Sequence, residues 1–227
     1  MSTPVVDLRV WRVERLAPAL LRMATGRRQL RDANGLRFAK LLGTGSGRTF
    51  TPGDADLQHW GLLTVWEDTR ASDAFAGHRV PRGWDEAAAE RLRVRMEPIA
   101  ARGQWSGEEP FEPAAPGRHE GPVAAITRAR LRPSRALSFW KAVPPVVDAL
   151  TVAPGLRLAI GVGEAPIGLQ GTFSLWDSGR DLVDFAYRSP AHVRTIERTQ
   201  PSRWYTEELF ARFAVLEVEG THRGSAP

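Results

Sequence analysis

The chain repeats itself, and this duplication limits the folds open to it more than any other feature. GLRFAKLLG at 35–43 returns as GLRLAIGVG at 155–163, and GLLTVWEDTRASDAF at 61–75 returns as GTFSLWDSGRDLVDF at 171–185. A fainter match joins WDEAAAERLRVRMEP at 84–98 to WYTEELFARFAVLEV at 204–218. Two similar units follow each other, so we expect a fold built from two similar halves.

Each half predicts the same order of elements. Alternation of apolar and polar residues predicts half-buried strands at VVDLRV (5–10), WGLLTVW (60–66), AITRARL (125–131) and LQGTFSLW (169–176). First helices are predicted at 17–24 and 134–143, and broken second helices over 72–92 and 181–213. VRMEP (94–98) and FAVLEVE (213–219) are the closing strands.

The order βαββαβ is that of a ferredoxin-like unit, whose sheet carries helices on one face only. We therefore expect an α+β chain of two fused ferredoxin-like halves, 5–103 and 121–222, forming an intramolecular α+β barrel. The Pro-, Gly- and Glu-rich stretch 104–120 is predicted to be the linker between them.

The composition excludes several classes of site. The chain has no cysteine, which removes disulfides, thiolate nucleophiles, iron–sulfur clusters and thiolate-ligated heme. The formal charge is +5, but the basic residues are spread along the chain among 26 acidic ones, which argues against a nucleic-acid surface. There is no secretory signal and no long apolar run, so we expect a cytoplasmic protein without an integral membrane segment.

The spacing of the matches singles out one histidine. They lie 120 residues apart at the first match and 110 apart over the second, because the first copy carries the extra segment GSGRTFTPGD (45–54). The spacing returns to 120 because the second copy has extra residues between Phe185 and Trp204, and these include His192. From the residues alone, His192 is either a surface or helix-capping histidine or a functional addition to one half.

Two other pairs of recurring residues each allow two interpretations. Trp66 and Trp176 recur at the same sheet position, where they are either core residues or part of a cavity wall. Arg37 and Arg157 also recur, either facing solvent or anchoring an anion. The glycine-rich LLGTGSGRTF departs from the phosphate-loop and dinucleotide spacings, and we expect it to be a loop over a cavity mouth that contributes Arg48 or Thr49.

GLRFAKLLGTGSGRTFTP, WKAVPPV, GLRLAIGVGEAPIG, GTFSLW and WYTEELFARFAVLEVEGTH together resemble the spheroidene monooxygenase family of carotenoid ketolases, from about Val5 to His222. The resemblance implies a heme-dependent oxygenase of the dimeric α+β barrel superfamily. In several heme proteins of that superfamily a histidine from the second helix of one ferredoxin-like unit carries the iron. In this chain, the resemblance implies that His192 has this iron-binding role.

The resemblance leads to a specific site. His192 is expected to ligate heme b, with Arg188 and Arg157 as partners for the heme carboxylates. A pocket on the opposite side of the heme is expected to be lined by Phe38, Trp66, Phe173 and Trp176. Arg48, Lys40 and Arg37 are the candidate catalytic residues facing the substrate.

The implied reaction is oxidation of a small or elongated apolar substrate, with electrons from an external donor. A homodimer is compatible with the fold. Three alternatives stay open: a heme-dependent lyase or dehydratase acting on an N–O bond, a cofactor-free monooxygenase or small-molecule binder of the same fold, and a heme carrier or sensor.

Overall fold

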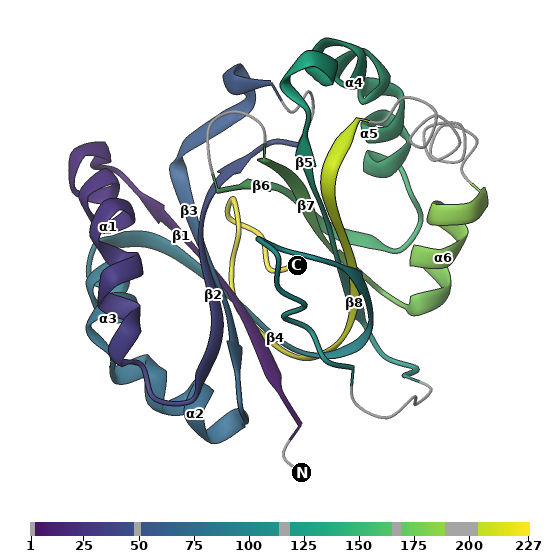
Figure 1. The fold of residues 1–227 in the computed structure, drawn as a ribbon. Coiled ribbons are helices and arrows are strands. Elements are labelled where there is room, and N and C mark those ends of the chain that lie inside the picture. Colours follow the sequence, from purple (N-terminus) through teal and green to yellow (C-terminus); the bar gives the residue numbers. More distant parts are fainter. Residues whose placement is uncertain (1–2, 48–50, 114–118, 165–168, 189–203) are drawn as a thin grey trace.

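The fold was analysed in a computed structural model, which describes residues 3–47, 51–113, 119–164, 169–188 and 204–227 (Figure 1). Eight antiparallel strands close into a barrel in the order β1-β3-β2-β6-β7-β5-β8-β4. The strands are β1 (Val5–Val13), β2 (Leu36–Gly45), β3 (Ala55–Trp66), β4 (Ala88–Gly103), β5 (Val123–Leu131), β6 (Leu156–Gly163), β7 (Leu169–Trp176) and β8 (Tyr205–Gly220). The predicted α+β barrel of two fused ferredoxin-like halves is confirmed.

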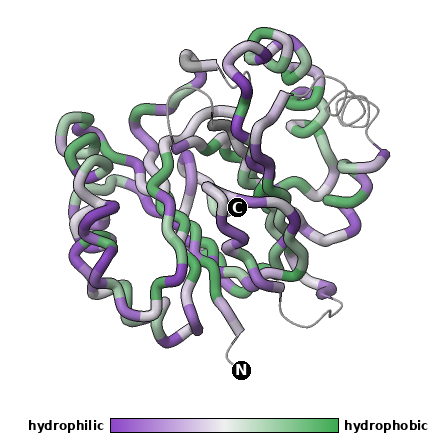
Figure 2. Tube along the Cα trace, in the orientation of Figure 1, coloured by the Kyte–Doolittle hydropathy of each residue, from purple (hydrophilic) through white to green (hydrophobic). Residues whose placement is uncertain are grey.

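Each half contributes four neighbouring strands, β4-β1-β3-β2 and β8-β5-β7-β6. The helices lie outside the barrel, with those of the first half at the left and those of the second half at the right in Figure 1. They are α1 (Leu16–Gln29), α2 (Thr69–Ala74), α3 (Arg79–Asp85), α4 (Ala136–Ala142), α5 (Pro144–Thr151) and α6 (Gly179–Arg188). Every strand therefore has one face toward the barrel interior and one toward the helices, as the alternating colours along the strands in Figure 2 reflect.

Two seams join the halves. The longer one pairs β4 with β8, from Leu92 opposite Gly220 to Gly103 opposite Leu209. The shorter one pairs the end of β2 with β6, where Gly45 lies opposite Gly161. A Cβ atom on Gly161 would stand 2.9 Å from the backbone N of Gly47, so a side chain there would push the two copies apart. The glycines of this segment thus allow the backbones of the two halves to approach each other at the shorter seam.

Strands β4 and β8 correct the predicted second helices. Residues 88–92 and 205–213 were expected to be helical because Ala, Glu, Leu and Arg favour helices. Both segments instead begin strands of 16 residues each. Each of these strands pairs on both sides, with β1 and β8 for β4 and with β4 and β5 for β8, and this pairing outweighs the local helix preference.

The described part of the linker contributes to the core. Trp105 is 1% exposed and Phe111 is 3% exposed, and both belong to the apolar cluster that fills the barrel. The Phe111 ring packs edge-on against Phe213, with 4.9 Å between centroids. The described part of the linker therefore closes the barrel interior while it connects the halves.

Candidate functional site

The strand register gives an exact correspondence between the halves. Val5 on β1 lies opposite Trp66 on β3, and Val123 on β5 lies opposite Trp176 on β7. Since side chains alternate along a strand, the helix-facing positions of β1 correspond one by one to those of β5. The two outer faces, each between sheet and helices, can therefore be compared position by position.

In the first half this face is filled by large side chains. After Val5, the helix-facing residues of β1 are Asp7, Arg9 and Trp11, and all are buried. The Trp11 ring stacks on Trp84 of α3 at a centroid distance of 5.5 Å, and its Nε1 donates a hydrogen bond of 2.7 Å to Asp85. The apolar side chains here form one continuous cluster between sheet and helices.

In the second half the same positions hold small side chains. Asp7, Arg9 and Trp11 are replaced by Ala125, Thr127 and Ala129.

The neighbouring strands show the same trend. On β7, Thr172 stands where β3 has Leu62. On β6, Gly161 stands where β2 has Leu41. The helices of the second half therefore face a sheet with much less side-chain volume on its surface.

The packing of the second half follows from these small residues. Its apolar side chains form two separate clusters, one around Leu131 at one end of β5 and one around Val123 at the other. Between them, Thr127 in the middle of β5 is exposed and Thr172 beside it is half-buried. We call the outer-face residues Ala125, Thr127, Ala129, Gly161 and Thr172 the small-residue face. Ala125, Ala129 and Gly161 are buried, with the backbone of Gly47 against Gly161, so the exposed part of this face lies at Thr127.

Two polar side chains are placed near this face. Trp140, on α4, packs against the cluster around Leu131, and its buried Nε1 has no hydrogen-bond partner. Arg212 on β8 lies opposite Ala125 and is exposed. An indole N–H and a guanidinium are donors for an anionic or carbonyl group. Neither residue, nor Thr127, was predicted from the sequence, where the available signal was the replacement of large side chains by small ones in the second copy.

The four aromatic residues predicted to line one pocket lie on separate surfaces. Phe38 and Phe173 point into the barrel, where they join the interior cluster. Trp66 lies under the helices of the first half, and Trp176 lies under those of the second. Of the four, only Trp176 is on the helix-facing side of the second half, where the small-residue face lies. Phe173, on the same strand, points to the opposite side because it is an odd number of residues away.

The described cations of the predicted site are each paired with an acid. Arg157 Nε lies 2.5 Å from Asp177, and Arg188 Nη1 lies 3.3 Å from Asp184. Arg37 pairs with Glu112 on the protein surface at 3.4 Å. His192 and Arg48 lie outside the described residues, as does Thr49.

Lys40 belongs to an ion cluster where the linker enters the barrel. Its Nζ lies 3.0 Å from Glu164 and 2.7 Å from Ser106 Oγ. Arg128 pairs with Glu207 and also contacts Glu164 at 3.5 Å.

Glu207 holds the linker turn within this cluster by accepting hydrogen bonds from two linker N–H groups, those of Ser106 and Gly107. Burial alone would raise the pKa of Glu207, but the hydrogen bonds from Arg128 and from these two N–H groups outweigh it and lower the pKa to about 2. The cluster therefore ties the linker to the barrel.

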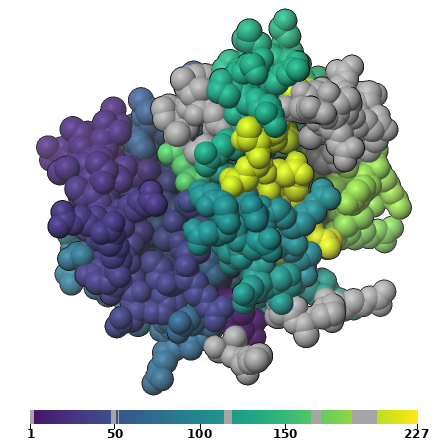
Figure 3. Space-filling model, in the orientation of Figure 1, coloured from purple at the N-terminus to yellow at the C-terminus, as the bar shows by residue number. Residues whose placement is uncertain are grey.

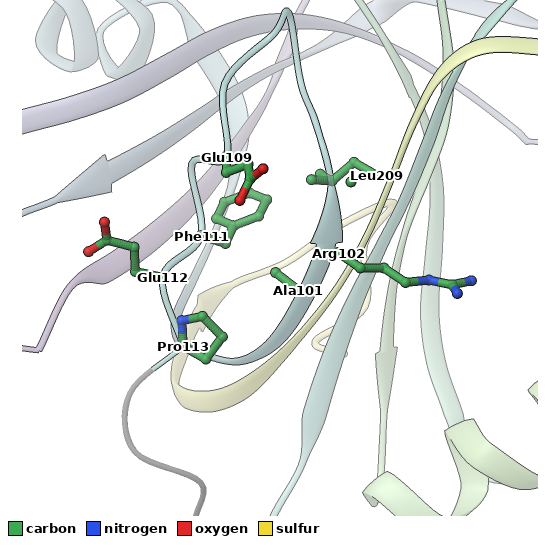
Figure 4. Close-up of a pocket in the computed structure, with 8 residues that line it drawn as sticks. Ala101, Arg102, Glu109, Phe111, Glu112, Pro113 and Leu209 are labelled. Atoms are coloured by element: carbon green, nitrogen blue, oxygen red, sulfur yellow. The ribbon is translucent and has the colours of Figure 1, made fainter.

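A pocket of about 240 Å³ lies at the linker. Figure 4 shows it between the linker and strands β4 and β8. Its lining consists of Ala101, Arg102, Gly103, Glu109, Phe111, Glu112, Pro113 and Leu209. No described residue of the predicted site or of the small-residue face lines it, although its lining residue Glu112 pairs with Arg37.

Comparisons with known proteins show the kinship of the chain. No protein-family model matches it. Among solved structures, aldoxime dehydratase aligns with 99% of this chain and 86% of its own, at a TM-score of 0.64 and 12% identity. Aldoxime dehydratase OxdRE in complex with butyraldoxime aligns at the same TM-score and 14% identity. These likenesses show the fold.

Curated relatives are closer in sequence. Spheroidene monooxygenase of Rhodobacter capsulatus is 36% identical over 99% of this chain and 95% of its own length. The enzyme of that name from Rubrivivax gelatinosus is 40% identical over 84% of this chain and 73% of its own. The chain belongs to the spheroidene monooxygenase family.

Proposed function

We propose that the chain is a monooxygenase that binds heme b on the small-residue face and oxidises an apolar organic substrate such as the spheroidene for which its relatives are named. Membership of the family supports oxygenase chemistry. The observation that carries the location is the replacement of Asp7, Arg9 and Trp11 by Ala125, Thr127 and Ala129 in the otherwise matching half.

The residues of the face fit a heme. A heme is a flat apolar macrocycle with two carboxylates, and it needs a slot with apolar walls and donors at the edge. The small side chains of β5 leave little bulk on the outer surface of the sheet, and the clusters around Leu131 and Val123 provide apolar walls on either side. Trp140 Nε1 and Arg212 supply donors, and Arg188 and Arg157 are further partners for the carboxylates once their exposed carboxylate partners are displaced.

The ligand proposed for the iron is His192. This assignment rests on the sequence: the residue follows α6 in the chain, lies in an insertion that the first half lacks, and takes the place that the family resemblance implies for an iron-ligating histidine. A neutral imidazole is a strong donor for iron, and the chain has no cysteine to compete with it.

When bound, the heme would supply activation of O₂, with electrons from an external donor. The chain itself would hold the substrate. Apolar side chains of the two clusters would exclude water from it, and the Thr127 and Thr172 hydroxyls would orient a polar end of the substrate or an ordered water. Arg48, Lys40 and Arg37 remain candidates for a substrate-facing role, but Lys40, in the linker cluster with Glu164, and Arg37, paired with Glu112 of the linker, are not part of the small-residue face.

The test is the absorption spectrum of protein produced with heme supplied. We expect a heme Soret band that is lost or shifted in His192→Ala and retained in His78→Ala. His78 is a matched control because its Nδ1 accepts a hydrogen bond from Val80 N at the start of α3. Protein without a Soret band under these conditions would favour the cofactor-free alternative.

Turnover separates the remaining chemistries. Product formed with spheroidene only when both O₂ and a reductant are present supports the oxygenase. An enzyme that converts an aldoxime without either one would instead be the lyase. Heme binding without turnover of either substrate would leave the carrier or sensor.

A further inference from the structure

We propose that helix α1 docks the protein onto an anionic membrane surface. This inference concerns the first half of the chain and does not depend on the heme proposal. It starts from the solvent face of α1, which is apolar where a surface helix is normally polar.

The exposed side chains of α1 lie on one side of the helix. Leu16, Leu20 and Leu21 are 40%, 50% and 66% exposed, and Ala17 and Ala24 between them are exposed as well. At about 100° per residue these five positions fall within less than half of the helix circumference. We call them the α1 patch. The opposite side of the helix, with buried Ala19 and Gly26, packs on the sheet.

The same side of the helix becomes basic toward its end. Arg27 and Arg28 in the last turn and Arg31 just beyond it are all exposed. No acidic residue occurs between Glu14 and Asp32, and Asp32 is engaged with His78 and Arg79. Figure 2 shows this change along α1 from green to purple, and Figure 3 shows the segment at the surface of the molecule.

Leucines beside arginines that have no acidic partner among the described residues fit a lipid surface. An interfacial helix buries leucines among the acyl chains near the headgroups, while arginine side chains reach back to the phosphates. No helix of the described residues is long and apolar enough to cross a membrane. Binding in the plane of the interface is the membrane contact that α1 can make.

A second copy of the chain fits the patch less well. In a twofold contact the same patch meets itself, so the arginines of both copies would enter an interface to which α1 brings no acid. An anionic membrane, in contrast, supplies the missing negative charge. Nucleic acid would also supply it, but would leave the leucines without an apolar partner.

The test is cosedimentation of the full chain with vesicles. We expect binding to mixed phosphatidylglycerol and phosphatidylcholine vesicles, little binding to phosphatidylcholine alone, and weaker binding as salt is raised. The double variant Arg27→Gln/Arg28→Gln should bind about 30-fold more weakly, since each arginine near an anionic surface contributes about a factor of five. Leu20→Ser/Leu21→Ser should lose about tenfold or more because less apolar surface enters the interface.

Leu137→Ser is the matched control, because Leu137 is an exposed leucine, at 72%, on helix α4 of the other half. It should bind like the unmodified chain, and thermal melts should show that all variants are equally folded. The proposal is overturned by absence of binding to anionic vesicles, or by α1 variants that bind as the control does. A change from dimer to monomer in Leu20→Ser/Leu21→Ser, measured by light scattering, would assign the patch to a second copy and would also overturn it.

Discussion

Trp11 and Ala129 occupy the same position on the central strands of the two halves, and they differ by an entire indole ring. Trp11 closes the space between sheet and helices in the first half, where it is 2% exposed. Ala129 leaves that space unfilled by its own side chain. The two halves can therefore be compared directly. The first half is filled by large side chains at this position, and the second half has a small side chain where we propose that a cofactor sits.

Truncating Trp11 should be costly. Trp11→Ala removes the stack on Trp84 and leaves Asp85 without its indole donor. We expect the free energy of unfolding to fall by about 3–5 kcal/mol, the usual range for a buried large aromatic side chain. Urea denaturation measures it, with the exposed Leu137→Ala as a control that should change stability by less than about 0.5 kcal/mol. A loss as small as that of the control would show that the first-half face is loosely packed.

The ion pair of Glu207 should make stability fall in strong acid. Its pKa is lowered from 4.5 in the unfolded chain to about 2 in the folded protein. The stabilisation is therefore complete above about pH 4.5 and is lost as the pH falls toward 2, and it amounts to about 3 kcal/mol at most. Urea unfolding across this range should show the loss in the unmodified chain.

Glu207→Gln is the matched variant for that measurement. It should be less stable at neutral pH, because it leaves Arg128 buried without this charged partner, and its stability should change less between pH 4.5 and 2. Equal pH slopes for the two proteins would show that Glu207 is not held as the contacts indicate.

The C-terminal tail should respond to milder acid. His222 packs against His59 with 4.8 Å between ring centroids, and Glu90 accepts hydrogen bonds from Thr221, Arg223 and Gly224. Burial, with the nearby His59 and Arg223, lowers the pKa of His222 from 6.5 to about 4.

Because the unfolded chain takes up the His222 proton first, folding stability should decrease as the pH falls from about 6.5 to 4, by about 3 kcal/mol at most. Amide hydrogen exchange at the tail should speed up in the same window. His222→Gln should remove this pH dependence. Unchanged exchange in the native protein from pH 6.5 to 4 would contradict the prediction.

The fold could be predicted because the sequence patterns that specify its strands are local and occur in both halves. Alternation along segments such as WGLLTVW fixes strands and their faces, and the repeat fixes the number of units. The starts of β4 and β8 were predicted as helix, because the decisive interaction there is pairing with strands distant in the sequence. Likewise, the composition of the linker gave no sign that Trp105 and Phe111 enter the barrel.

The site was predicted less well than the fold. The paired recurrence of Trp66 and Trp176 drew attention to large residues that match between the halves, and these serve the packing of sheet and helices. The informative positions were those that do not match, such as Trp11 against Ala129. Finding them required the strand register, because none of the repeat matches covers β1 or β5, so the sequence alone leaves their alignment undetermined.

The central claim is that the small-residue face of the second half holds heme, and the most direct measurement is a heme titration of the unmodified chain and of Ala129→Trp, followed at the Soret band. We expect the unmodified chain to bind heme stoichiometrically, whereas Ala129→Trp, filled as the first half is by Trp11, should remain folded and lose the band. Absence of heme binding by the unmodified chain, or equally tight binding by Ala129→Trp, would contradict the account.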